Sequence, residues 1–152
     1  MTDPATHRPS GLPDPEYHAE FYEDVPSKRL IAWVIDTIVI AIMVFGVSLL
    51  GFFLPLLIWP ALYAVIGFFY RWLTIAAGSA TLGMRFMAIE FIDRDGRPFD
   101  SGTALLHTAG YTISVITAPL QLISVIMMLV TPRRQGLTDT ILGTAAVNRR
   151  VR

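Results

Sequence analysis

One arginine and two aspartates stand out because they lie in or beside long apolar segments. Arg29 and Asp36 belong to the run SKRLIAWVIDTIVIAIMVFGVSLLG at residues 27–51, and Asp139 lies in TPRRQGLTDTILGT at residues 131–144. A carboxylate that faces lipid costs at least about 2.5 kcal/mol on insertion scales, so we expect Asp36 to face other helices or a polar cavity. Carboxylates in such places can bind a proton or a cation.

The spacing of these charges leaves two interpretations open. Arg29 and Asp36 are seven residues apart, which puts them on one helix face about 10 Å apart, too far for easy direct contact. In the first interpretation Asp36 binds a cation or proton, and Asp139 with Arg29 forms a gate at the entrance. In the second, Arg29 pairs with Asp139 and locks the C-terminal segment onto the helices, while Asp36 is hydrogen-bonded to a small polar side chain. The candidate partners of Asp36 are Ser114, Thr117 and Ser124.

Arg134, Arg85 and His107 are candidate supporting residues beside the apolar regions. We interpret His107 as a satisfied histidine near the membrane interface rather than as a proton relay. The three histidines lack the spacing of a metal site, and the chain has no cysteine. Without a nucleophile–base pair, a metal cluster or a cofactor loop, the sequence predicts neither an enzyme nor a cofactor.

The composition is that of a membrane protein. Of the 152 residues, 53% are hydrophobic and only 16% are charged, and the apolar residues form long runs. The expected partner is therefore the lipid bilayer. Since the net charge is zero, no basic field points to nucleic acid.

Three apolar regions organise the chain. Residues 30–51 and 54–77 predict two membrane-spanning helices, joined as a hairpin by a short uncharged turn that contains proline. Tyr70, Arg71 and Trp72 are expected to mark a membrane interface. Residues 103–130 form the third region, which is long for one span and short for two, with Pro119 near its middle.

The cationic residues help to choose a topology. They precede the first helix, occupy the central polar segment and follow the third region, and cationic segments usually stay in the cytoplasm. Under that rule both termini are cytoplasmic, and the third region returns as a bent or re-entrant helical hairpin broken near Pro119. A single span with an external C-terminus is the alternative. The predicted fold is thus an all-α, multi-pass membrane protein.

A small β element is expected in the cytoplasmic segment. Residues 85–92 predict a strand that is followed by a reversal at residues 93–96, and residues 144–148 are its expected partner. Thr138 or Asp139 is a candidate cap for a short helix.

The two ends of the chain are expected to lie outside a membrane domain at residues 27–148. Residues 1–26 form an acidic, proline-rich tail, disordered to about residue 15 and followed by a possible interfacial helix. That helix would place Tyr17, Phe21 and Tyr22 on one face. Residues 149–152 form a basic tail.

The order of these motifs closely resembles the RDD family of integral membrane proteins, which is named for one arginine and two aspartates. The resemblance runs from about residue 25 to residue 147 and rests on Arg29, Asp36, the segment GSATLGMRFMAIEFIDRDG and RRQGLTDTILGTAAV. It makes Arg29 the family arginine and Asp36 and Asp139 the family aspartates. Two cationic positions differ, because Met84 replaces the usual lysine and His107 stands where members often have arginine.

What the resemblance implies is a location in the bacterial inner membrane and a role in transport, with sodium/proton exchange suggested for some members. On that basis the expected function is a transporter or a cation- or proton-translocating module that uses Asp36, with Na⁺ or H⁺ as the ion. The alternative is a non-catalytic accessory or assembly subunit of a larger membrane complex. Three or four helices rarely enclose a pathway alone, so a homo-oligomer or a larger complex is expected.

Overall fold

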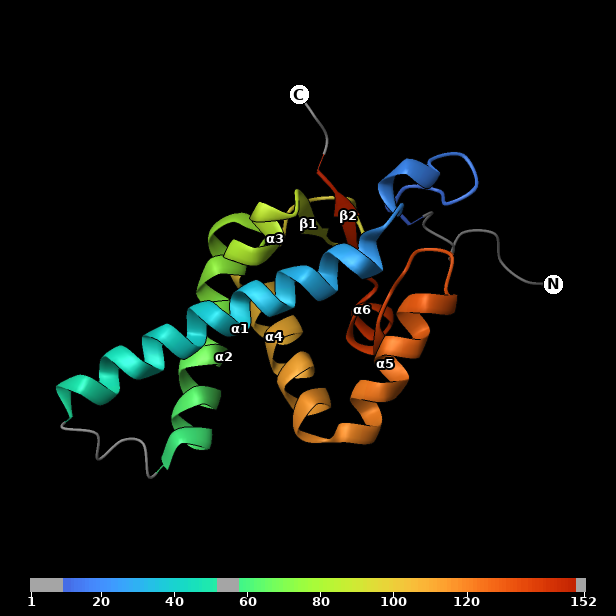
Figure 1. The fold of residues 1–152 in the computed structure, drawn as a ribbon. Coiled ribbons are helices and arrows are strands. Elements are labelled where there is room, and N and C mark those ends of the chain that lie inside the picture. The colour runs from blue at the N-terminus through green and yellow to red at the C-terminus, as the bar shows by residue number, and fades with distance from the viewer. Residues whose placement is uncertain (1–9, 52–57, 150–152) are drawn as a thin grey trace.

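The computed structural model describes residues 10–51 and 58–149 as helices arranged around a two-stranded sheet (Figure 1). This confirms the predicted helical fold class with its small β element. The elements in chain order are η2 (Ala19–Phe21), α1 (Val25–Leu50), α2 (Trp59–Gly78), α3 (Leu82–Phe86), β1 (Ile89–Ile92), α4 (Ser101–Ile116), α5 (Ala118–Val130), α6 (Leu137–Leu142) and β2 (Ala145–Asn148).

Helices α1 and α2 are each long and apolar enough to cross a membrane. Helix α1 begins at Val25, five residues before the predicted start, because Pro26 occupies the first turn, where its missing N–H costs nothing. Arg29, one residue before the predicted start, therefore lies within the helix. The predicted start of the second helix, at residue 54, lies outside the described residues.

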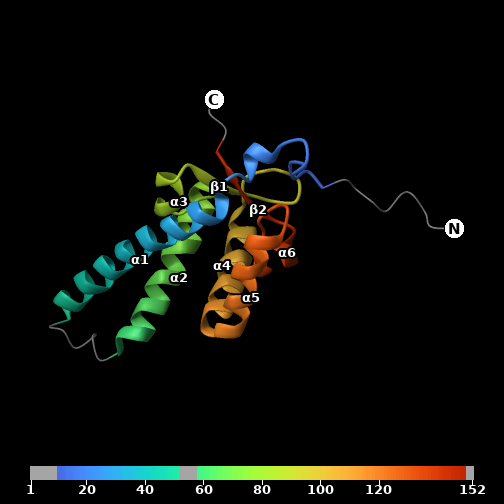
Figure 2. The same cartoon turned by 45° about the vertical axis from the view of Figure 1, so that its right-hand side comes forward.

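The third apolar region is a pair of helices rather than one straight span. Helices α4 and α5 are bent by 116° at a break around Thr117. Pro119 lies in the first turn of α5, where it starts a new helix instead of continuing the old one. Both outer ends of the pair return toward the sheet (Figures 1 and 2), as a bent hairpin requires.

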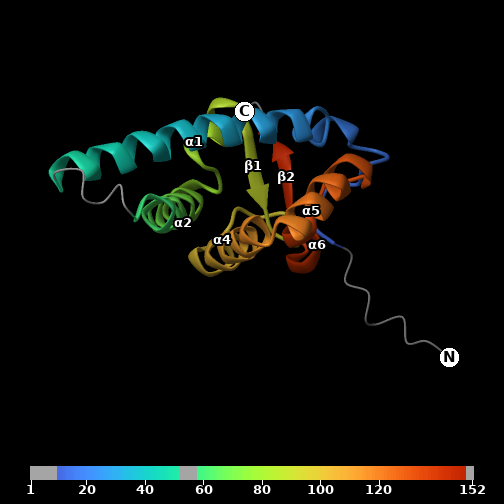
Figure 3. The same ribbon diagram turned by 60° about the horizontal axis from the view of Figure 1, so that its bottom comes forward.

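The two strands pair as the sequence predicts. Strands β1 and β2 are antiparallel, with Ile89 opposite Asn148 and Ile92 opposite Ala145, and Figure 3 shows them between α1 and the helices α4 to α6. The reversal after β1 is closed by the Gly96 N–H, which donates to the Asp93 carbonyl at 3.0 Å. The predicted start of this strand was wrong, because residues 85–86 belong to helix α3.

The largest cluster of buried apolar side chains lies at the sheet end of the molecule, where α1, α2, α3, β1, α4 and β2 meet. Its members are Val25, Ala32, Ile75, Ala80, Met84, Ile89, Phe91, Phe99, Ala104 and Ala146. Farther along, α1 and α2 share a smaller cluster of Ile40, Val44 and Tyr70. Most of the remaining apolar side chains of the long helices are exposed, as expected for surfaces that face lipid.

Part of the N-terminal tail packs onto the sheet. Prediction of disorder to residue 15 was wrong for residues 10–15, because Leu12 is buried beside β2 and the Gly11 N–H donates to the Arg94 carbonyl at 2.7 Å. Residues 1–9 lie outside the described part of the chain. The expected interfacial helix is only the short η2, which contains Phe21 but not Tyr17 or Tyr22. The three aromatic residues do not share one face, since Tyr17 is exposed and Tyr22 is buried.

Candidate functional site

Asp36 is a buried carboxylate with three hydrogen-bond donors. The Tyr70 hydroxyl donates to Oδ1 at 2.6 Å, the Thr81 hydroxyl donates to Oδ2 at 2.6 Å, and the Gly83 backbone N–H donates to Oδ1 at 2.9 Å. The partners predicted from sequence, on the third apolar region, were wrong. Helix α2 and the segment that starts α3 supply the donors instead, so Asp36 joins α1 to two other elements.

Helix α3 reaches Asp36 because of two residue choices at its start. Thr81 is the N-cap, and its hydroxyl accepts the Met84 N–H at 3.2 Å while donating to Asp36. Gly83 lies so close to α1 that a Cβ there would be 2.2 Å from the Ala32 carbonyl oxygen. Only glycine allows this approach, which also aims the Gly83 N–H at the carboxylate.

Asp139 is almost fully buried and accepts four hydrogen bonds. Arg29 Nη1 lies 2.6 Å from Oδ2 and His107 Nε2 lies 2.9 Å from Oδ1. The Gly136 N–H donates to Oδ2 and the Thr144 hydroxyl donates to Oδ1, both at 3.1 Å. The expected contact between Arg29 and Asp139 is therefore present, and it joins α1 to α6 and, through His107, to α4.

The surroundings of Asp139 favour its charged form. Burial alone would raise the pKa of its carboxyl, but the positive charge of Arg29 and the hydrogen bond from His107 outweigh burial and hold the pKa well below its usual range. Asp139 is not the cap of α6, and neither is Thr138, because Gly136 occupies that position. Instead, Asp139 in the first turn accepts the N–H of the cap residue.

The supporting residues separate into two groups. His107 belongs to the Asp139 cluster, and its ring also packs against Phe91 at 4.3 Å between centroids. Arg85 and Arg134 lie elsewhere and bind main-chain carbonyls at helix ends. Arg85 donates to Ala80 and Thr74, and Arg134 donates to Leu129. The arginine–aspartate–aspartate set therefore forms two sites, one around Asp36 and one around Asp139.

A cavity of approximately 80 Å³ lies between these two sites, and residues from α1, α2, α3, β1 and α4 line it. Asp36 and Arg29 both reach it, together with Arg71, whose guanidinium lies over the Tyr111 ring at 4.9 Å. Thr108 also lines it, and its buried hydroxyl has no hydrogen-bond partner in the described part of the chain. The cavity has room for about two water molecules beside these polar groups.

Two residues of this region were missed by sequence reasoning, which assigned Tyr70 and Arg71 to a membrane interface. Tyr70 is instead buried against α1, with 7% of its surface exposed. The sequence did offer a signal that this part of the helix faces protein, namely Arg71, because an arginine within an apolar helix is expected to face protein or a polar cavity.

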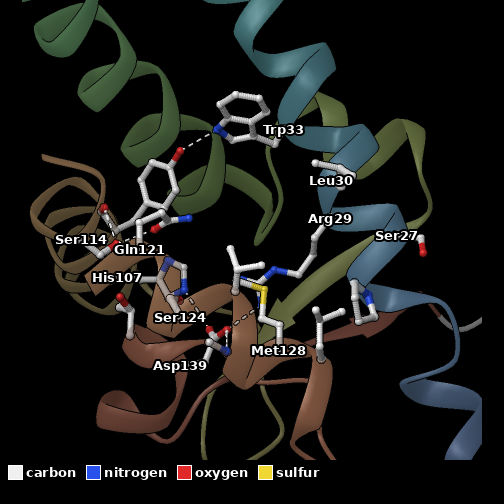
Figure 4. Close-up of a pocket in the computed structure, with 16 residues that line it drawn as sticks. Ser27, Arg29, Leu30, Trp33, His107, Ser114, Gln121, Ser124, Met128 and Asp139 are labelled. Atoms are coloured by element: carbon white, nitrogen blue, oxygen red, sulfur yellow. Dashed lines mark hydrogen bonds and ion pairs between the residues drawn. The ribbon is translucent and has the colours of Figure 1, made fainter. Parts of the chain in front are cut away.

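A larger pocket of approximately 510 Å³ lies between α1 on one side and α4, α5 and α6 on the other (Figure 4). Arg29, His107 and Asp139 form its polar end, and Trp33 lies toward the opposite end. There the Trp33 indole N–H donates to the Tyr111 hydroxyl at 2.9 Å. Arg29, Trp33, His107 and Tyr111 line both cavities.

Metal binding finds no support in residues 10–51 and 58–149, where no group of three His, Cys, Asp or Glu side chains is placed to hold an ion. Within the described residues Asp36 accepts three hydrogen bonds and Asp139 accepts four, and each carboxylate connects α1 to other elements directly or through Arg29.

Comparison with known proteins places the chain in a family. The model of the RDD family matches residues 25–143, which include Arg29, Asp36 and Asp139. No curated protein and no solved structure matches the chain. Because the match covers most of the sequence and two helices are able to span a bilayer, the chain is a membrane protein that belongs to the RDD family.

Proposed function

We propose that this RDD-family protein is a non-catalytic accessory or assembly subunit of a larger membrane complex, and that its buried charges hold its helices together. The observation that carries the proposal is that Asp36 accepts hydrogen bonds from three donors on other elements. A carboxylate that binds a transported cation must offer free lone pairs to that cation. Most of the lone-pair positions of Asp36 already accept hydrogen bonds from protein donors.

The charges around the small cavity support the same conclusion. Arg29 and Arg71 both line the cavity that Asp36 reaches, and a cation entering it would meet two guanidinium groups. At the other site, all four lone-pair positions of Asp139 are occupied by donors. Neither carboxylate is arranged to take up Na⁺, and the Arg29–Asp139 contact serves as a lock rather than as a gate.

Cation or proton translocation through Asp36 is the second candidate, and one observation favours it. Asp36 lines the same small cavity as His107, and His107 contacts Asp139, which lines the larger pocket. In this candidate the ion would pass from Asp36 on α1 toward Asp139 on α6 by way of His107, with Na⁺ or H⁺ as the ion carried.

The proposed location is the bacterial inner membrane, with both termini in the cytoplasm. Positive charge is concentrated at the sheet end, where Lys28 binds Asn148 and Arg149 contacts Glu90. Residues 37–51, 58–70 and 108–132, which extend away from that end, include no charged residue. This distribution is the one that the positive-inside rule associates with a cytoplasmic sheet end. The proposed partner is another membrane protein or further copies of this chain.

Flux measurements test the proposal. Purified wild-type protein, Asp36→Asn protein and empty liposomes are compared with a pH-sensitive dye trapped inside, under imposed Na⁺ or K⁺ gradients. We expect the wild-type protein to give the same leak as empty liposomes, and a defined protein complex to co-purify from native membranes in mild detergent.

A wild-type flux above that of empty liposomes contradicts the accessory role. If Asp36→Asn abolishes that flux, the second candidate replaces the first. If Asp36→Asn keeps it, the protein transports by a route that does not use Asp36. Thermal unfolding of both proteins is measured in parallel, because the accessory role predicts that Asp36→Asn lowers stability and changes no flux.

A further inference from the structure

The structural role of the charges does not explain the pocket of approximately 510 Å³ between α1 and the α4–α5 pair, which is here called the lateral pocket. Its volume lies within the range of about 300 to 1,000 Å³ that ligand pockets occupy. We propose that the lateral pocket binds one bilayer phospholipid, with ester and phosphate oxygens at its polar end and an acyl chain along its apolar wall.

The hydrogen-bonding groups at the polar end decide which chemistry fits. Asp139 already accepts four hydrogen bonds, so its carboxylate offers no free acceptor. Arg29 has five N–H donors, and one nitrogen is engaged with Asp139. The Arg29 side chain lines the pocket and 16% of it is accessible. This end of the pocket therefore has donors to offer and no free carboxylate acceptor.

Gln121, near the start of α5, supplies a further free donor to the lateral pocket. Its Oε1 accepts the Ser114 hydroxyl at 2.9 Å, while its NH₂ group has no hydrogen bond within the described residues. Both side chains line the lateral pocket, and Figure 4 shows Gln121 beside Ser114 near its wall. Ester and phosphodiester oxygens of a phospholipid are acceptors only, so they complement free N–H groups of Arg29 and Gln121. A cation has no free carboxylate to bind here.

The wall of the lateral pocket is apolar and reaches the lipid-facing surface. Leu30 on α1 and Val125 and Leu129 on α5 line it, with 63%, 41% and 57% of their surfaces exposed. Met128 also contributes to this wall. A pocket that is apolar, partly open toward lipid and donor-rich at one end matches the two chemically different parts of a phospholipid.

This inference rests on membrane location alone and does not depend on the proposed accessory role. The probe is phosphatidylglycerol with two oleoyl chains, added at defined ratios to delipidated protein in mild detergent and counted by native mass spectrometry. We expect one phospholipid per chain to be retained at a lipid excess at which further copies are not. Retention of no phospholipid, or of a graded series without a preferred first copy, overturns the proposal.

Matched variants place the lipid in the lateral pocket. Val125→Phe fills the pocket and is expected to reduce retention about fivefold or more, whereas Ile126→Phe is the control, since Ile126 is 49% exposed on the same helix and does not line the pocket. Gln121→Leu removes the free NH₂ group and is expected to weaken retention by a similar factor. Equal retention by all three variants and the wild type overturns the proposal.

Tryptophan quenching tests the site without a change in the pocket. Trp59→Phe and Trp72→Phe leave Trp33, which lines the lateral pocket, as the only one of the three tryptophans. In bilayers that contain phosphatidylglycerol with brominated chains, we expect half-maximal quenching of Trp33 at a mole fraction well below one half. Quenching that only follows the bulk mole fraction of brominated lipid overturns the proposal even if the pocket variants fail to fold.

Discussion

Replacing Tyr70 by phenylalanine tests directly whether Asp36 is a structural tie. The Tyr70 hydroxyl donates to the Asp36 carboxylate at 2.6 Å across the α1–α2 contact, and both side chains are buried. Tyr70→Phe keeps the ring and removes this donor alone. Asp36 then retains the donors from Thr81 and Gly83, so the protein is expected to fold.

The expected loss follows from the kind of bond. A hydrogen bond to a charged group contributes about 1.5–3 kcal/mol in soluble proteins, while side-chain bonds between membrane helices average about 0.6 kcal/mol and reach about 1.7. The bond in question is short, buried and charge-assisted, and two other donors remain on Asp36. We therefore expect Tyr70→Phe to lower the free energy of unfolding by about 1–2 kcal/mol.

The assay is equilibrium unfolding of the purified protein in mixed micelles, with Tyr63→Phe as the matched control. Tyr63 lies on the same helix, packs against Trp59 and makes no hydrogen bond through its hydroxyl within the described residues, so its loss should change stability by less than about 0.5 kcal/mol. In the Asp36→Asn background, Tyr70→Phe should cost about half as much, because the acceptor is neutral. Equal stabilities of Tyr70→Phe and Tyr63→Phe would refute the reasoning.

Three further predictions concern other contacts, all measured by the same unfolding assay. Gly83→Ala should destabilise by more than about 2 kcal/mol, because its Cβ would lie 2.2 Å from a carbonyl oxygen of α1, whereas Gly46→Ala meets nothing within 4 Å and should stabilise by up to about 1 kcal/mol. Arg29→Lys should lose about 1 kcal/mol, since the guanidinium lies over the Phe91 ring at 5.4 Å; no loss would contradict that stacking. Because the folded-state pKa of Asp139 is lowered, its ionised carboxylate stabilises the fold above about pH 4, and this stabilisation is lost as the pH falls toward the folded-state pKa. Asp139→Asn should therefore lower the stability at pH 7 and make the loss of stability between about pH 5 and pH 3 less steep than in the wild type. Parallel pH profiles of the two proteins would contradict this assignment.

Much of the fold is determined by local properties of the sequence. The apolar runs are long enough for spanning helices, and hydropathy depends on each segment alone. Pro119 predicts the break in the third region because proline cannot continue a helix from within it. The cationic segments at the same ends of the helices required the chain to return, which brings β2 beside β1. The contact between Arg29 and Asp139 follows from that return.

The partners of Asp36 were decided only by the tertiary structure. They depend on how α1 is rotated, and the apolar pattern of a lipid-exposed helix leaves that rotation open because most of its faces are hydrophobic. Helix α3 was not predicted, because residues 85–86 were expected to begin a strand, and the close approach of Gly83 to α1 cannot be read from a local pattern. The separation of the three family charges into two sites, and the entry of Arg71 between them, follow from these packing choices. Sequence composition thus determined which segments are able to span a membrane, and helix rotation and close packing decided what each buried charge contacts.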